Sequence, residues 1–283
     1  MAGTAIDTPA GAVVLMISGS GPTDRNDNSR LTHNNAMQKL AEGLAARGYA
    51  SLRYDKRFSG VTRLESHEES QITLDRYAED ASYWLNEARR RFPGRPVLPL
   101  GHSEGGTVAL RLSQLQPVDG LVLVAVAGRP LDRLVMEQME AGGASAATVI
   151  VLGDRLSALR DGRLIGEVPA TLKALLRPGV YPFWRSMFAF DAPAAFAGFA
   201  GPALLVYGER DLQVSLIDLE LFVAARPGAR SKVFATMNHV LKAAPPDRAG
   251  NLALYQQPDV PLETGLVAAI AEFLGGVKAS TAH

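Results

Sequence analysis

The chain has 283 residues, of which 47% are hydrophobic and 20% are charged, a composition typical of a globular protein with a large apolar core. Lys and Arg together number 29, as do Asp and Glu, so there is no net basic charge that would favour nucleic acid as a partner. Cysteine is absent, which excludes disulfides, a thiolate nucleophile and cysteine-ligated metals.

Strands and helices are predicted to alternate along the chain. Continuous apolar runs at residues 12–18 and 121–126 predict strands that are covered on both faces. Further strands are predicted at residues 49–54, 96–100, 203–207 and 232–235. Apolar side chains at helical spacing predict helices, at residues 37–44, 74–88, 108–115 and 262–273. This alternation predicts an α/β fold with a mostly parallel, doubly wound sheet, which binds its ligand at the carboxyl ends of the strands.

The segment between Gly128 and Gly201 breaks this alternation. It contains no convincing strand, although residues 148–152 are ambiguous, and its apolar residues recur at helical spacing. A connection of ~70 residues is rare within a compact domain. We therefore predict a helical lid inserted over the carboxyl edge of the sheet at residues 131–200, and a core formed by residues 1–130 and 201–283.

The most informative stretch is GHSEGG at residues 101–106, which follows an apolar strand and precedes a helix. It has the pattern G-x-S-x-G, in which small residues let strand and helix approach closely while one serine occupies the apex of a sharp turn. Ser103 is the predicted nucleophile, although a buried turn without chemistry would have the same pattern.

A serine hydroxyl needs a base within hydrogen-bond reach and an acid that orients this base. His239 follows the strand predicted at 232–235 and is the predicted base. Asp211 follows the strand predicted at 203–207 and is the predicted acid, with Glu209 as its rival. The chain order Ser103, Asp211, His239 is the order that this strand–turn–helix architecture uses for its triad.

The other four histidines fit different roles. His102 lies in the turn, where its side chain should point away from the reacting side of Ser103. His33 and His67 are interpreted as solvated residues, and His283 is terminal.

Acyl transfer also needs hydrogen-bond donors aimed at the oxyanion. One predicted donor is the backbone N–H of Glu104, at the start of the helix after the serine. The second is the N–H of Ser20, with Gly21 close behind, in the small-residue loop after the first predicted strand. The alternative role of this loop, a phosphate cradle, lacks the P-loop and dinucleotide-binding patterns.

Five motifs occur in order across most of the chain: ISGSGPTDRN at 17–26, RYDKR at 53–57, GHSEGG at 101–106, GERDLQV at 208–214 and NHVLK at 238–242. Through them the chain resembles the α/β-hydrolase superfamily, especially its bacterial serine-esterase and aminopeptidase-like branch. The resemblance implies that Ser103, Asp211 and His239 form a Ser-His-Asp triad.

The predicted function is therefore that of a serine carboxylesterase-like enzyme, which cleaves esters of small to medium acyl groups through an acyl-enzyme without a metal or other cofactor. The same triad would serve aminopeptidase-like amide hydrolysis, thioester hydrolysis or acyl transfer, and a catalytically inert binding protein is a further alternative. An aminopeptidase would need an acidic subsite for the substrate amine, for which Glu104 is the nearby candidate.

Two further groups of residues allow two interpretations each. In the predicted lid, four large side chains either line an acyl pocket or form the core of the lid itself: Tyr181, Trp184, Met187 and Phe188. The charged run at residues 53–57 suggests catalysis by its clustering, but we interpret it as a structural ion-pair network near the active-site loop.

No stretch approaches the ~20 apolar residues that a membrane-spanning helix needs, and the first residues lack the pattern of a secretory signal. We therefore expect a cytoplasmic monomer or homodimer. Its expected partner is a small-molecule ester, rather than nucleic acid or a membrane.

Overall fold

The computed structural model describes residues 2–3, 11–61 and 69–279. Its core is a seven-stranded sheet in the order β1-β3-β2-β4-β5-β6-β7. Strand β1 (Ala2–Gly3) is antiparallel to β3. The other six strands are parallel: β2 (Val13–Ile17), β3 (Ser51–Arg53), β4 (Val97–His102), β5 (Leu121–Val124), β6 (Ala203–Gly208) and β7 (Arg230–Phe234). This sheet confirms the predicted α/β fold class.

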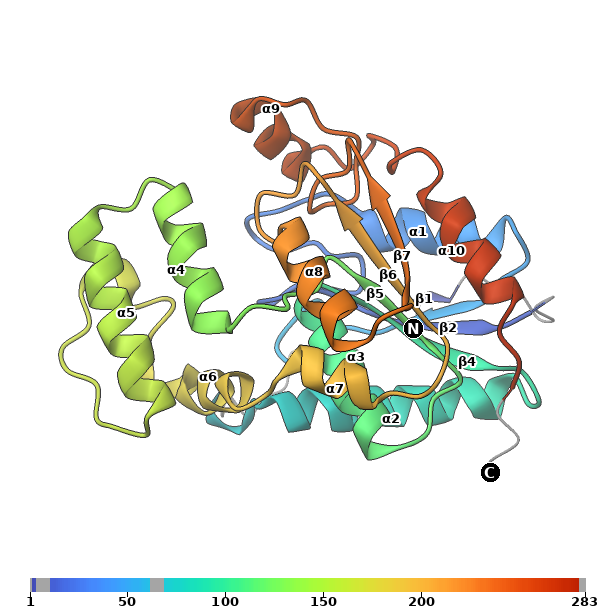
Figure 1. Ribbon diagram of the computed structural model, residues 1–283, viewed down its shortest axis with the longest axis horizontal. Coiled ribbons are helices and arrows are strands. Elements are labelled where there is room, and N and C mark those ends of the chain that lie inside the picture. Colours follow the sequence, from blue (N-terminus) through green and yellow to red (C-terminus); the bar gives the residue numbers. More distant parts are fainter. Residues whose placement is uncertain (1, 4–10, 62–68, 280–283) are drawn as a thin grey trace.

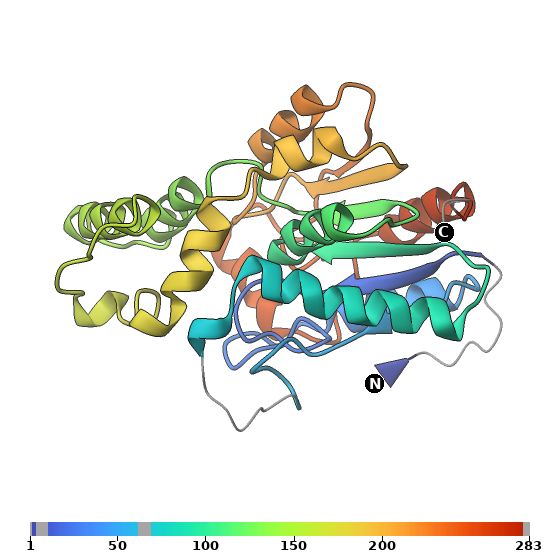
Figure 2. The same ribbon diagram turned by 90° about the horizontal axis from the view of Figure 1, so that it is seen from below.

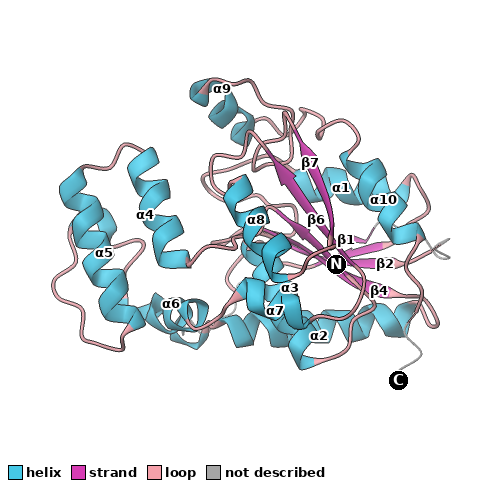
Figure 3. Cartoon of the chain, viewed as in Figure 1, coloured by secondary structure: helices cyan, strands magenta, loops and turns pink. Residues whose placement is uncertain are grey.

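Helices cover both faces of the sheet (Figures 1 and 3). One face packs against α1 (Ala36–Ala45) and α10 (Leu266–Gly275), and the other against α2 (Leu74–Arg91) and α3 (Glu104–Leu115). In β2, Leu15 faces the α2–α3 layer whereas Val14 and Met16 face the α1–α10 layer. Strands buried on both faces explain why the sequence shows continuous apolar runs rather than alternation.

The remaining helices connect or follow the strands of the second half of the chain. The α-helices are α4 (Leu131–Ala141), α5 (Ala146–Arg160), α6 (Tyr181–Phe188), α7 (Ala192–Gly198), α8 (Leu216–Ala225) and α9 (Arg248–Ala253). Four 3₁₀ turns are η1 (Glu69–Gln71), η2 (Ala170–Leu172), η3 (Pro178–Val180) and η4 (Leu254–Gln256). In the described ranges, none of the helices has the length and apolar character that crossing a membrane requires.

Two elements differ from their sequence patterns. The last helix starts at Leu266 rather than at Leu262, because Gly265, with φ at 85°, turns the chain immediately before it. The ambiguous residues 148–152 lie inside the helix α5. The side chain of Ser145 caps this helix by accepting a hydrogen bond from Thr148 N–H, which favours a helix over a strand.

Helices α4, α5 and α6 form a projecting unit, hereafter the α4–α6 unit, at one end of the molecule (Figures 1 and 2). It has its own apolar cluster, built from Leu152, Leu156, Leu159, Leu172, Leu176 and Trp184. Helix α7 falls within the lid predicted at residues 131–200 but packs against α3 and α8 of the core. Its Phe196 is fully buried, with its ring 5.5 Å from that of Phe222 in an edge-to-face arrangement.

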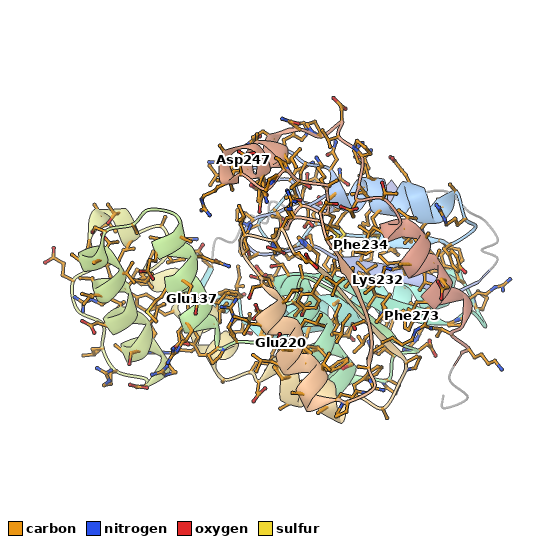
Figure 4. The ribbon with its side chains drawn as sticks, turned by 45° about the horizontal axis from the view of Figure 1, so that its top comes forward. Glu137, Glu220, Lys232, Phe234, Asp247 and Phe273 are labelled. Atoms are coloured by element: carbon orange, nitrogen blue, oxygen red, sulfur yellow. The ribbon has the colours of Figure 1, made fainter. Side chains whose placement is uncertain are left out.

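A buried carboxylate fixes the point where the α4–α6 unit leaves the core. Asp218, at the start of α8, is fully buried and lies 2.7 Å from the guanidinium of Arg129. It also accepts a hydrogen bond from Gly128 N–H at 3.0 Å. Arg129 in turn pairs with Glu137, which lies on the side of α4 that faces the core (Figure 4). The unit therefore starts from a rigid junction with α8.

The packing of α7 predicts the effect of a cavity. Replacing Phe196 by Ala should lower the free energy of unfolding by ~3–5 kcal/mol, because the fully buried ring fills the space between α3 and α8. Replacing Leu164, which is 98% exposed, should change it by less than ~0.5 kcal/mol. Urea unfolding measures both values. Similar losses for the two variants would contradict the placement of α7 in the core.

Candidate active site

The turn after β4 holds Ser103 in a strained conformation. Its φ is 53° and its ψ is −123°, and its N–H donates to Val124 O at 2.8 Å. A Cβ at Gly101 would lie 2.2 Å from the carbonyl oxygen of Gly105, and one at Gly105 would lie 2.2 Å from that of Ile17. The glycines are therefore required by close backbone packing, and the turn projects one serine as a nucleophile elbow does.

The predicted acid and base are hydrogen-bonded to each other. Asp211 Oδ2 lies 2.7 Å from His239 Nδ1, and Asp211 Oδ1 accepts from the N–H groups of Gln213 (2.7 Å) and Val214 (3.0 Å). The Asp211 side chain is 1% exposed. An ionised carboxylate only accepts, so His239 Nδ1 is the donor of this hydrogen bond. In the neutral imidazole with this tautomer, Nε2 is the nitrogen that can take a proton.

The loops that carry the acid and the base are packed together. A Cβ at Gly208, at the end of β6, would lie 2.0 Å from Met237 O, so only glycine permits this approach. Arg210 N–H donates to the same carbonyl oxygen at 3.1 Å. Asn251 then bridges the two loops, since its side chain donates to Arg210 O and accepts from Asn238. The rival acid Glu209 is exposed.

His102 connects three loops from the interior. Its Nδ1 forms an ion pair with Asp27 Oδ2 at 2.7 Å, outside the alignment of a regular hydrogen bond, and its Nε2 lies 2.9 Å from the carbonyl oxygen of His239. Asp27 Oδ1 accepts from Gly19 N–H at 2.8 Å. Both ring nitrogens of His102 thus face acceptors, which indicates an imidazolium. Among the described residues, His102 is not one of those that line the cavity beside Ser103.

The charge on this buried pair follows from two opposing effects. Burial by itself lowers the pKa of His102 and raises that of Asp27. The mutual attraction and contact of the two groups outweigh burial, so the pKa of His102 is raised and that of Asp27 is lowered. A charged pair therefore joins the loop after β2 to the loop that contains His239.

These contacts bring the loops of the three predicted triad residues together. The rings of His102 and His239 have their centroids 4.8 Å apart. A Cβ at Gly19 would lie 3.5 Å from Ser103 Cβ. Within the described residues, Ser103 Oγ and His239 Nε2 have no hydrogen-bond partner; catalytic hydrogen bonds are often long in structures without substrate.

The predicted oxyanion donors line the same cavity as Ser103, which lies between the core and the α4–α6 unit. Ser20, Gly21, Ser103 and Glu104 all line it. In the part of the chain that the structure describes, no acceptor is bonded to the backbone N–H of Ser20, Gly21 or Glu104. Unoccupied N–H groups beside a serine, one of them at a helix start, are what an oxyanion requires.

The charged run after β3 forms three ion pairs, as the predicted ion-pair network requires. Asp55 binds Arg25 (2.7 Å), Arg57 binds Asp80 (2.6 Å) and Lys56 binds Glu104 (3.1 Å). Lys56 is almost fully buried, and its ammonium also donates to the carbonyl oxygen of Gly19.

Sequence reasoning did not single out Asp27, and it placed Lys56 in an ion-pair network without its contacts to Gly19 and Glu104. Both stand in polar loops, where charged residues are normally solvated, and no periodicity marks them. Their burial, at 5% and 2% exposure, appears only once the strands are assembled. Within the described ranges, no group of three or more His, Asp or Glu side chains is arranged to hold a metal ion.

A cavity of about 530 Å³ lies between the core and the α4–α6 unit. Leu131, Val135 and Met139 contribute its apolar wall from α4, and Trp184 and Met187 contribute from α6. Its volume falls within the range of small-molecule sites.

The four side chains that the sequence placed at a pocket divide between two roles. Trp184 and Met187 line the cavity, and Trp184 Nε1 donates to Leu175 O at 2.9 Å. Tyr181 and Phe188 are instead partly buried against the apolar cluster of the α4–α6 unit, where the Phe188 ring stacks on Trp184 at 5.6 Å. Of the remaining histidines, His33 is exposed, whereas His67 and His283 lie outside the described residues.

Comparisons with known proteins find relatives in sequence and in fold. A family model described as serine aminopeptidase, S33, matches residues 30–157, which include the Ser103 turn and end before Asp211 and His239. The chain is 28% identical over 245 residues to Esterase EstD of Thermotoga maritima. The matched region covers 81% of this chain and 54% of that protein. The chain thus spans about half the length of this curated relative.

Two solved structures share the fold along most of both chains. An esterase from Thermogutta terrifontis, solved with malate bound, superposes with a TM-score of 0.57 at 20% identity, covering 96% of this chain and 92% of the other. BpoC from Mycobacterium tuberculosis, described as a non-heme bromoperoxidase, gives a TM-score of 0.58 at 17% identity, covering 98% and 96%. At these identities the likeness is one of fold.

Asp55 supplies a prediction about pH. Burial by itself raises its pKa, but the hydrogen bonds from Arg25 and from two backbone N–H groups outweigh burial and lower the pKa from 3.8 to about 2. A pKa lowered by folding stabilises the fold at pH values above the unfolded pKa, and this contribution is lost as the pH falls towards the folded pKa.

The variant Asp55→Asn should therefore be less stable than the wild type by roughly 2 kcal/mol at pH 7, and the difference should shrink once the pH falls below about 4. Urea unfolding between pH 7 and pH 3 measures this difference. Glu87→Gln, which removes the ion pairs with the solvent-exposed Arg90 and Arg91 on α2, serves as the control and should have a much smaller effect. A difference that widened with acid would contradict the assignment.

Proposed function

Because the chain belongs to the α/β-hydrolase superfamily, we propose that it is a serine hydrolase that cleaves carboxylic esters of small to medium acyl groups. The observation that carries the proposal is the 2.7 Å hydrogen bond between Asp211 and His239, on a loop that is tied through His102 to the strained turn of Ser103. The likeness to an esterase over most of the chain supports ester substrates.

In the proposed mechanism, Ser103 Oγ attacks the ester carbonyl carbon while His239 Nε2 takes the hydroxyl proton. The carbonyl oxygen becomes an oxyanion that accepts hydrogen bonds from the N–H groups of Ser20 and Glu104. Asp211 stabilises the imidazolium of His239, which then protonates the leaving alkoxide. Water attacks the acyl-enzyme by the same route, with His239 as base, and releases the acid and Ser103.

The charges around the cavity favour an uncharged substrate. Glu104, the candidate subsite for a substrate amine, is paired with Lys56, and Glu69 is paired with Arg177. A cationic amino group would have to displace one of these partners. The apolar wall from α4 and α6 supports a hydrophobic acyl group. Hence we propose ester hydrolysis rather than aminopeptidase activity.

Removal of each triad residue should have a distinct effect on the hydrolysis of p-nitrophenyl butyrate. Ser103→Ala should lower kcat by up to ~10⁶-fold, because the nucleophile is lost. Asp211→Asn should lower kcat by ~10⁴-fold, because the amide stabilises the wrong tautomer of His239. Labelling of the wild type by a fluorophosphonate, absent in Ser103→Ala, is the control. Equal rates for wild type and Ser103→Ala would remove Ser103 from the chemistry.

Substrate preference can be measured with matched leaving groups. The wild type should hydrolyse p-nitrophenyl butyrate with a kcat/KM at least ~10²-fold above that for leucine p-nitroanilide, since Glu69 and Glu104, which line the cavity, are paired with cations. Butyryl p-nitroanilide separates the effect of the amide bond from that of the substrate amine. A preference for leucine p-nitroanilide over butyryl p-nitroanilide would instead favour an aminopeptidase.

A further inference from the structure

A buried ammonium lies directly behind the proposed oxyanion hole. Lys56 is 2% exposed, and its Nζ donates to the carbonyl oxygen of Gly19. The same Nζ lies 3.1 Å from Glu104 Oε1 and 5.3 Å from the centroid of the Tyr77 ring. The charge is thus enclosed by a carbonyl oxygen, a carboxylate and an aromatic face, all of which favour a cation.

The carbonyl of Gly19 and the N–H of Ser20 belong to one peptide group. That carbonyl oxygen also accepts a hydrogen bond from Thr23 Oγ1 at 2.8 Å, and the preceding Gly19 N–H is bonded to Asp27 at 2.8 Å. Hydrogen bonds to a peptide oxygen draw electron density from its nitrogen, which makes its N–H a stronger donor. A charged donor such as an ammonium has the larger effect.

Lys56 also reaches the second proposed donor. Its partner Glu104 carries the other oxyanion N–H at the start of α3. A single ammonium therefore fixes the Ser20 peptide and the first residue of α3 relative to each other. Because Lys56 follows β3 and Glu104 follows β4, this contact holds two separate loops in register around the substrate carbonyl.

We infer that Lys56 is the positioning residue of the oxyanion hole: through the carbonyl oxygen of Gly19 it orients and polarises the Ser20 N–H, and through Glu104 it sets the distance between the two donors. This inference rests on the proposed ester hydrolysis at Ser103. Lys56 does not contact the substrate itself and acts in the transition state, where charge develops on the oxygen.

The test is the variant Lys56→Met, assayed with p-nitrophenyl butyrate and with butylboronic acid. The boronic acid forms a tetrahedral adduct with a catalytic serine and places an oxygen in the oxyanion hole. We expect kcat to fall by about 10- to 100-fold, less than the loss of a whole donor. KM should change by less than about threefold, and affinity for the boronic acid should fall in parallel with kcat. A residue that only stabilised the fold would not lower kcat and the affinity for the boronic acid in parallel in the folded variant.

Two further variants define the effect. Thr23→Val removes the uncharged donor to the same Gly19 oxygen and should lower kcat by less than Lys56→Met does. Arg226→Met removes a cation that donates to Gly201 O at 2.9 Å. Gly201 precedes β6, so this contact lies at the amino end of the strands, away from the candidate site at their carboxyl ends. It should lower stability and leave kcat within about threefold of the wild type.

If Lys56→Met does not fold, Lys56→Cys gives a second measurement, because the chain has no other cysteine. Aminoethylation of the unfolded variant and refolding would restore an ammonium in thioether linkage, with the wild type treated identically as control. We expect aminoethylation to raise kcat at least about tenfold above that of unmodified Lys56→Cys. Alkylation to an uncharged hydroxyethyl group should raise kcat by less. Equal recovery with both groups would overturn the inference.

The outcomes separate the two proposals. Wild-type kcat in folded Lys56→Met, while Ser103→Ala is inactive, would overturn the role of Lys56 and leave the proposed function intact. Undiminished hydrolysis by Ser103→Ala would instead end the proposed function and the role of Lys56 with it.

Discussion

The contact on which the candidate site most depends is the buried ion pair between Asp27 and His102. A parallel sheet brings the loops after its strands to one edge, but it does not fix them to within the distance of a hydrogen bond. Asp27 binds the loop after β2, and His102 extends the connection to the carbonyl oxygen of His239 after β7. Because His102 is the residue before Ser103, the pair connects the loop of the predicted base to the turn of the predicted nucleophile.

Burying charges at this site is tolerated because each charge has a partner. A buried ion that loses its partner is strongly destabilising, so arrangements of the loops that separate these pairs are disfavoured. Asp55 forms an ion pair with Arg25 in the loop after β2. The next residue, Lys56, donates to the carbonyl oxygen of Gly19 and pairs with Glu104. These consecutive side chains thus have different partners, one in the loop after β2 and one at the start of α3.

The α4–α6 unit contributes a different kind of interaction. Its apolar cluster is separate from the core clusters, and it is joined to α8 through Arg129 and Asp218. The cavity lies where this unit meets the polar loops, so one wall is apolar and the other carries Ser103 and the unoccupied N–H groups. This division suits a substrate with a hydrophobic acyl group and one reactive carbonyl.

The amino-acid sequence by itself determined the strands and helices and the close backbone packing of the Ser103 turn. Continuous apolar runs marked strands buried on both faces, and G-x-S-x-G marked the approach of strand and helix that the glycines at 101 and 105 permit. These signals are local, since they depend on residues a few positions apart. The order Ser103, Asp211, His239 indicated which side chains should meet, and the hydrogen bond between the last two agrees with it.

Only the tertiary structure decided which partners each side chain has. Phe196 lies in a stretch that reads as lid, yet it packs in the core, because a helical apolar pattern shows that a face is buried and not against what. Lys56 and Gly19 are 37 positions apart, and nothing in either segment specifies the other. Burial and ion pairing across such separations arise when the strands assemble, because only then are loops from different strands brought into contact and shielded from water.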